Sequence, residues 1–230
     1  MKKKVESVNS FYDSIAVDYE DYMTDSDKKI RKKVSDLFKI NVPIGYVLDF
    51  GGGTGLDLRW LLEEKYHVFF LEPSVNMRAI AKNRFSITPK NISPAFIEKN
   101  MNIEDWTNEN LPFNEKVDGV LANFAVLNCM KDIKIFFEKM SLVTGGNSHI
   151  IASVIDPRLR NIVRHYSILG SLNMFLRGKL RILNQHKGVY HDTYIHSVKS
   201  IKAASHKYFR LNSIVQSEIS NFTILILSKR

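Results

Sequence analysis

The sequence has little cysteine and no long hydrophobic run, and each shortage excludes a class of protein. Cys129 is the single cysteine among 230 residues, which excludes an internal disulfide and fits a reducing compartment. No apolar stretch approaches the roughly 20 residues that a membrane-spanning helix requires. Polar and charged residues follow residues 1–4, so we expect no signal peptide there. The absences together predict a cytoplasmic protein.

Metal sites and repeats are also missing from the pattern. The chain has seven histidines, but no pair of histidines or cysteines has the spacing of zinc ligands, so we expect no metal. Neither an internal repeat nor a low-complexity linker interrupts the chain. A hydrophobic fraction of 44% with 11% aromatics is enough for a packed core. We therefore expect one domain over residues 1–230, with an N-terminal helical arm at residues 1–42.

The net charge of +9 has two interpretations. It could indicate a nucleic-acid or acidic-membrane partner, or it could reflect a lysine-rich surface. The basic residues are scattered along most of the chain, which favours the second interpretation. Residues 158–187 are the exception.

The glycine-rich stretch at residues 46–57 is the most informative segment. The apolar run 46–50 leads directly into a turn that contains Gly51, Gly52, Gly53 and Gly55. Closely spaced glycines allow positive φ angles and let a ligand approach the main chain. A second apolar run ends in Glu72, where a nucleotide-binding βαβ unit places the carboxylate that binds ribose hydroxyls. This order of elements predicts a site for an adenosine-type ligand.

Apolar periodicity predicts alternating strands and helices through the middle of the chain. The expected strands are 46–50, 67–71, 95–99, 117–122 and 149–155, preceded by helices at 7–22 and 26–40. Such alternation indicates a mostly parallel sheet with helices on both faces. The last two runs, 209–218 and 222–229, are too close for a crossover helix and should form an antiparallel hairpin. The sequence thus predicts an α/β, Rossmann-like, doubly wound, mostly parallel seven-stranded sheet that ends in an antiparallel β-hairpin.

Several of these segments resemble motifs of the class I S-adenosylmethionine-dependent methyltransferases, and the resemblance covers nearly the whole chain. Residues 47–55 resemble the first motif, residues 71–77 the second, and residues 117–123 the fourth strand. Two departures stand out. Asn102 replaces the usual aspartate near the adenine, although an amide oxygen can still accept from the adenine amino group. Residues 143–146 read Val-Thr-Gly-Gly where the family usually has Lys-Pro-Gly-Gly.

The resemblance implies S-adenosylmethionine as cofactor and S-adenosylhomocysteine as product. The main chain of the glycine turn would lie against the methionine part, and Glu72 would accept both ribose hydroxyls. Met77 and Ile103 would enclose the adenine, while Asn123 and Phe124 would face the sulfonium. The full set of implied cofactor-binding residues is Asp49, Gly51, Gly52, Gly53, Gly55, Glu72, Pro73, Met77, Asn102, Ile103, Asn123 and Phe124.

Residues 156–196 are expected to form a helical lid insertion before the last helix, where the family carries substrate-recognition insertions. The segment interleaves apolar residues with Arg158, Arg160, Arg164, Arg177, Lys179, Arg181 and Lys187. Its basic edges favour an anionic or carrier-bound acceptor, although a solvated helix pair would show the same pattern. His191 is the candidate base, because histidine titrates near working pH. Tyr19 is the second catalytic candidate, since its helix resembles one that folds over the cofactor, but it could equally pack the arm onto the body.

The leading functional hypothesis is methyl transfer to an O or N nucleophile of a small molecule by in-line displacement. Alignment and exclusion of water are then the main tasks of the enzyme. Residues 123–126 are not the Asn/Asp-Pro-Pro-aromatic tetrapeptide of nucleobase methylases, which disfavours the alternative of an RNA methyltransferase. The glycine spacing departs from G-x-G-x-x-G, which disfavours a nicotinamide-dependent oxidoreductase. A non-catalytic cofactor-binding partner subunit stays open, and we expect a monomer or a homodimer.

Overall fold

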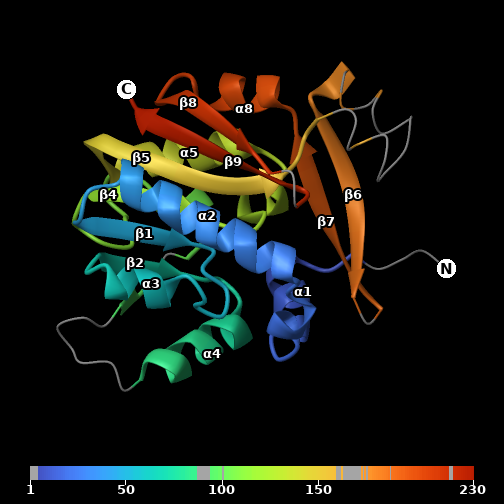
Figure 1. Cartoon of the computed structure of the whole chain (residues 1–230), viewed down its shortest axis with the longest axis horizontal. Helices are drawn as coiled ribbons and strands as arrows, with labels where there is room; N and C mark the ends of the chain where they lie inside the picture. Colours follow the sequence, from blue (N-terminus) through green and yellow to red (C-terminus); the bar gives the residue numbers. More distant parts are fainter. Residues whose placement is uncertain are drawn as a thin grey trace.

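The computed structural model describes residues 5–86, 94–99, 101–158, 162, 172, 174, 176–186, 188–217 and 220–230. Its helices (Figure 1) are α1 (Val8–Ile15), α2 (Asp25–Asn41), α3 (Leu58–Glu63), α4 (Val75–Phe85), α5 (Ile133–Val143) and α8 (Val198–Ser205), with short 3-10 turns η1 (Tyr19–Tyr22), η3 (Ile103–Asp105) and η4 (Val126–Cys129). The strands are β1 (Tyr46–Phe50), β2 (His67–Leu71), β3 (Ala95–Phe96), β4 (Val117–Ala122), β5 (Thr144–Ile155), β6 (Lys179–His186), β7 (Val189–His196), β8 (Phe209–Gln216) and β9 (Phe222–Lys229).

Seven strands form one sheet in the order β3-β2-β1-β4-β5-β9-β8. The pairs among β1 to β5 are parallel, while β9 runs antiparallel to both of its neighbours, β5 and β8. The predicted Rossmann-like sheet with a terminal antiparallel hairpin is therefore confirmed. Chain order reverses between β1 and β4, and ligands of such sheets bind at the carboxyl ends of the strands beside that reversal.

Each face of the sheet carries its own hydrophobic core. On one face α2 and α3 bury residues such as Val34, Phe38 and Leu61 against the strands. On the other face α5 and α8 pack residues such as Phe136 and Ile201 against the same strands (Figure 1). Both layers are continuous across β1, β4, β5 and β9. The strand ends between them are consequently held from both sides.

Some expected boundaries differ in the structure. The helix expected at 7–22 divides into α1 and η1, because the NH of Asp18 turns back to the carbonyl of Ile15 at 3.1 Å. Strand β3 covers only Ala95–Phe96. Strand β5 begins at Thr144, immediately after α5, since the Thr144 hydroxyl donates to the Met140 carbonyl and ends the helix. The two glycines that follow, Gly145 and Gly146, lie within the strand.

The expected helical lid is wrong for residues 179–196, which form the antiparallel pair β6–β7. The segment alternates: Leu180 is buried with its cross-strand partner Ile195, whereas Arg181 is exposed. Gly188 has a φ of 82° at the connection, which suits a tight hairpin. Residues 176 and 177 are helical. The rest of the expected lid at 159–161, 163–171, 173, 175 and 187 lies outside the described residues.

The described part of the chain contains no helix that is long and apolar enough to cross a bilayer.

We expect Gly119→Ala to destabilise the fold, because α2 rests directly on β4 at this position. A Cβ on Gly119 would lie 2.4 Å from Val42 Cγ1 and 3.0 Å from Phe38 Cζ. Overpacking of this kind costs about 1–3 kcal/mol, which urea denaturation would measure as a lower midpoint. Gly146→Ala is the matched control, since its Cβ would meet nothing within 4 Å. Equal midpoints for the two variants would contradict this account of the packing.

Candidate active site

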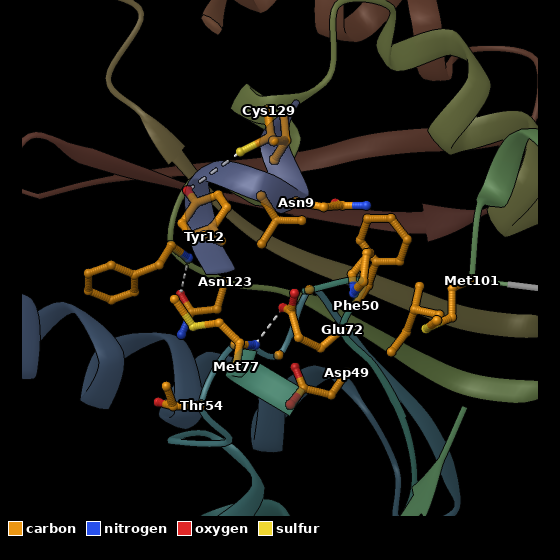
Figure 2. A pocket seen from close by; sticks show the side chains of 18 of the residues that line it. Asn9, Tyr12, Asp49, Phe50, Thr54, Glu72, Met77, Met101, Asn123 and Cys129 are labelled. Carbon is orange, nitrogen blue, oxygen red and sulfur yellow. Dashed lines mark hydrogen bonds between the residues drawn. The ribbon is translucent and has the colours of Figure 1, made fainter. Parts of the chain in front are cut away.

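A cavity of about 300 Å³ opens at the carboxyl ends of β1, β2 and β4, beside the reversal in strand order. The glycine turn after β1 and the end of β2 form one side, and the loop after β4 forms another. Helix α1 contributes Val8, Asn9 and Tyr12 to the lining. Figure 2 shows how the side chains from these elements converge on one space.

The glycine turn brings bare main chain to the cavity wall. Gly51 and Gly53 have φ angles of 71° and 60°, a region that residues with a Cβ rarely adopt. The NH of Gly51 donates to the Leu71 carbonyl at 2.8 Å, which ties the turn to the end of β2. A Cβ on Gly52 would lie 2.1 Å from the Phe70 ring. The packing therefore leaves no space for a side chain at Gly52.

Glu72 is a buried carboxylate that is held in place by main-chain donors. It is 8% exposed and accepts the NH of Gly53 at 2.9 Å and the NH of Ser74 at 2.7 Å. Burial raises the pKa of Glu72, although these two NH groups and the charge of Arg78 act in the opposite direction. The carboxylate thus connects the glycine turn to the start of α4 and borders the cavity.

Asp49, the acid within β1, carries an unpaired oxygen at the cavity. It is 1% exposed, and its Oδ2 has no hydrogen-bond partner. Burial raises the pKa of Asp49 well above its usual value, and the charge of Asp57 adds to this effect. A buried polar atom without a partner is costly. Its position in the lining marks a place where a cationic ligand group would be stabilised.

Arg31 and Asp57 form a charged pair that sequence reasoning did not identify. Arg31 Nη1 donates to Asp57 Oδ2 at 2.5 Å, and the Arg31 guanidinium lies 4.0 Å from the centroid of the Phe124 ring. Asp57 also accepts from Trp60 Nε1 at 3.0 Å and from Asn123 Nδ2 at 2.9 Å. Arg31 Nε is buried without a partner. A signal existed in the sequence, since Arg31 is the single arginine among the lysines of residues 28–33.

The loop after β4 has an unusual backbone. Phe124 and Ala125 both adopt positive φ angles, 57° and 63°, at a cost on the order of 1–3 kcal/mol each. Hydrogen bonds offset this cost: the NH of Phe124 donates to Ser153 Oγ at 2.6 Å, and the NH of Ala125 donates to the Ser153 carbonyl at 3.0 Å. The bend directs η4 back to the cavity, where Val126 and Cys129 join the lining.

Helix α1 covers the cavity and is fastened beside Glu72. Asp13 Oδ1 accepts the Ser74 hydroxyl at 2.6 Å and the NH of Asn76 at 2.9 Å, at the first turn of α4. Across the cavity the Tyr12 hydroxyl lies 3.6 Å from Cys129 Sγ (Figure 2). The nearby Cys129 and burial raise the pKa of Tyr12, and burial raises the pKa of Cys129 to about 11. Both groups stay protonated near neutral pH.

The structure brings most of the predicted site residues together. Tyr19 lines the cavity with Asp49, Gly51, Gly52, Gly53, Glu72, Pro73, Met77, Asn102, Ile103, Asn123 and Phe124. Gly55 is not in the lining; its φ is 81°, and an added Cβ would lie 3.1 Å from Ala81 Cβ. Gly55 therefore serves the packing of the turn on α4. No group of three potential metal ligands occurs among the residues that the structure describes.

His191, the predicted base, is not part of the cavity lining. It is 2% exposed, its ring centroid lies 4.1 Å from that of Phe11, and its Nδ1 is 3.1 Å from the Asp192 carbonyl. Burial lowers the pKa of His191. These contacts place the imidazole beneath α1, where it packs the hairpin β6–β7 against that helix.

Comparisons with known proteins agree with the observed architecture. Residues 21–198 match the sequence profile of a family described as "Methyltransferase domain". No curated protein matches the chain. Among solved structures, an S-adenosylmethionine-dependent methyltransferase from Clostridium acetobutylicum ATCC 824 is similar, with 14% identity, coverage of 95% of this chain and 98% of that one, and a TM-score of 0.65.

Two further similar structures carry ligand names in their descriptions. DhpI in complex with S-adenosylhomocysteine (SAH) shares 16% identity, with 95% of this chain and 93% of that one covered and a TM-score of 0.67. The glycopeptide N-methyltransferase MtfA complexed with SAH shares 9% identity, with 87% and 90% covered and a TM-score of 0.62. At these identities the likeness supports the fold.

Removing the Asp13 carboxylate should loosen α1. Asp13→Ala takes away the acceptor for both Ser74 Oγ and the NH of Asn76, and hydrogen bonds to a charged group contribute about 1.5–3 kcal/mol each. We expect amide hydrogen exchange in residues 8–15 to accelerate about tenfold or more. Asp25→Ala is the control, because Asp25 is exposed and pairs with Lys28 on the surface of α2. Unchanged exchange in α1 would show that Asp13 does not hold the helix.

Proposed function

The chain belongs to the methyltransferase-domain family that matches residues 21–198, and we propose that it methylates an oxygen or nitrogen nucleophile of a small molecule. It is an S-adenosylmethionine-dependent methyltransferase, and S-adenosylmethionine is its cofactor. One observation supports the proposed site above the others: a main-chain-bound carboxylate at Glu72 and an unpaired buried oxygen at Asp49 face the same cavity as the glycine turn.

The residues of the cavity fit the polar groups of this cofactor. We assign the ribose hydroxyls to Glu72, whose carboxylate is already fixed by two NH groups and can accept charge-assisted hydrogen bonds. The ammonium group of the methionine part fits Asp49, because it would satisfy the unpaired Oδ2. Its carboxylate fits Arg31, whose buried Nε is without a partner. The assignments at Asp49 and Arg31 thus each join an unpaired atom of the protein to a ligand group of opposite charge.

We place the adenine on the side of Glu72 that is opposite to Asp49 and Arg31. Met77 and Ile103 are both buried side chains in the lining and supply apolar contacts. Asn102 Oδ1 accepts the NH of Glu104 at 3.3 Å, which fixes the Asn102 side chain at the start of η3. We therefore assign Asn102 a place at the rim next to Ile103, where it borders the ring.

The bound cofactor supplies an electrophilic methyl group. The residues of this chain contribute alignment and exclusion of water. Helix α1 covers the cavity through Tyr12, and Asp57 fixes Asn123 from the side of the glycine turn. We propose Tyr19 as a residue that orients the acceptor, since it lines the cavity and burial raises its pKa. The location of His191 outside the lining does not support a role as base.

Replacing the Glu72 charge should weaken cofactor binding while the fold remains. Glu72→Gln keeps one oxygen acceptor for the main chain but removes the charge that strengthens bonds to the ribose hydroxyls. We expect titration calorimetry to show affinity for SAH lower by about 10- to 100-fold. Glu98→Gln serves as control, since Glu98 is exposed and pairs with Lys82 outside the cavity. If both variants bind SAH as the wild type does, Glu72 does not contact the ribose.

Affinity for SAH should also depend on pH through Asp49. The folded protein without cofactor holds a proton on Asp49 to a higher pH than the unfolded chain does, because burial raises its pKa. Stability from this group is therefore full below the unfolded pKa of about 3.9 and is lost as pH rises through the raised folded pKa. Binding of an ammonium group requires the carboxylate form, so affinity should rise over that same interval.

Asp49→Asn tests this linkage, because the amide cannot titrate. Calorimetry across pH should show affinity for SAH that rises with pH in the wild type and loses this slope in the variant. Thermal unfolding of the cofactor-free proteins should show the opposite trend, with the wild type losing stability relative to Asp49→Asn as pH increases. A wild-type binding slope that persists in Asp49→Asn would assign the titration to another group.

A further inference from the structure

The cavity has one end that the cofactor assignments leave open. This acceptor end is formed by α1 and η4 through Val8, Asn9, Tyr12, Val126, Cys129 and Met130. Figure 2 shows Asn9, Tyr12 and Cys129 together on the side of the cavity away from Asp49 and Thr54. Three of the six side chains are aliphatic or thioether groups, so a hydrophobic molecule fits here better than a strongly hydrated one.

Acidic residues outnumber basic ones in the described part of the cavity lining. Asp49, Asp57, Glu72 and Glu104 contribute four carboxyl groups, whereas Arg31 is the one cationic residue among the described lining residues. Arg31 is already paired with Asp57 at 2.5 Å. An anionic acceptor would lose its hydration on entering this cavity, where Arg31 is already paired with Asp57. Such desolvation is costly. A cationic group also loses hydration, but the carboxyl groups and ring faces of the lining can offset that cost.

Tyr12 brings an aromatic ring to the acceptor end, and a second tyrosine of the cavity lining, Tyr19, lies near it. The ring centroids of Tyr12 and Tyr19 lie 6.4 Å apart, and Tyr12 also lies 5.5 Å from Phe11. Burial and neighbouring groups raise the pKa values of Tyr12 and Tyr19, so both rings carry neutral hydroxyls. Neutral aromatic rings attract alkylammonium groups through their quadrupoles by about 0.5–2 kcal/mol. The rings therefore favour a nitrogen centre over an oxyanion.

We propose, on the premise of the methyltransferase function above, that the acceptor is a hydrophobic amine and that the reaction is N-methylation. The neutral amine nitrogen forms a bond to the methyl carbon with its lone pair, and the carbon–sulfur bond breaks with its electron pair kept on sulfur. The positive charge moves from sulfur to nitrogen, and the product ammonium later releases a proton to water. Total charge is unchanged across the step.

The contacts of the cavity agree with such a step. Tyr12 and Cys129 hold their protons near neutral pH, and Glu72 and Asp57 are each occupied by at least two donors. An amine needs no proton removed by the protein during attack, since its ammonium form equilibrates with water before binding. The basic segment 158–187 suggested an anionic acceptor in the sequence; the described cavity wall favours the opposite charge.

The test compares three ligands of similar shape in the presence of saturating SAH. Benzyltrimethylammonium imitates a methylated amine product, benzyl methyl sulfone is neutral, and benzylsulfonate is anionic. We expect calorimetry to show benzyltrimethylammonium binding about tenfold more tightly than the other two. Tyr12→Phe keeps a ring and should keep this preference, whereas Tyr12→Leu should reduce it severalfold. Tyr22→Leu is the control, because Tyr22 is exposed and outside the lining.

The outcomes separate the two levels of the proposal. If SAH itself does not bind to the wild-type protein, the proposed function fails. If SAH binds but benzylsulfonate or the sulfone binds as tightly as the ammonium, or if the ammonium does not bind, the amine acceptor is wrong and the methyltransferase assignment stands. Equal preference for the ammonium in Tyr12→Leu and wild type would also overturn the role given to the aromatic ring.

Discussion

The structure depends on keeping acidic side chains buried at the carboxyl ends of adjacent parallel strands. Asp49 and Glu72 are 1% and 8% exposed, and burial raises the pKa of both. Removing such groups from water is costly unless partners replace the lost hydration. Glu72 has two NH donors, but Asp49 Oδ2 has none. The protein without its cofactor thus carries an uncompensated acid, and a bound cation would release that cost.

The elements around these acids provide the compensation. Helix α2 brings Arg31 to Asp57, and Asp57 in turn receives Asn123 from the end of β4. The same Asn123 accepts the Ser153 hydroxyl at 2.7 Å, which supports the two left-handed residues that follow it. One charged pair thus fixes the loop after β4, and with it η4. The contacts among Arg31, Asp57 and Asn123 consequently help to determine the shape of the acceptor end.

Local sequence patterns were sufficient to predict the glycine turn, the position of Glu72 at the end of β2 and the terminal hairpin. Each of these features depends on residues that are adjacent along the chain. The role of Gly55 in packing and the position of His191 depend on contacts with Ala81 and Phe11, which lie far away in sequence. Arg31 was missed since its partner, Asp57, is on another element. The helical prediction was wrong for residues 179–196, because their strand conformation depends on the pairing of 179–186 with 189–196 and not on local spacing alone.

The cover over the cavity and the acid beneath it are joined through a single residue. Ser74 donates its NH to Glu72 and its hydroxyl to Asp13, so it contacts both the buried acid and α1. A ligand that shifts the Glu72 carboxylate would also shift Ser74, because the Ser74 NH donates to that carboxylate. The Ser74 hydroxyl, which donates to Asp13, would move with it. Hydrogen-bonded chains of this kind carry coupling between sites when both ends have alternative arrangements. Through Ser74, the position of Glu72 and the attachment of α1 thus depend on the same residue.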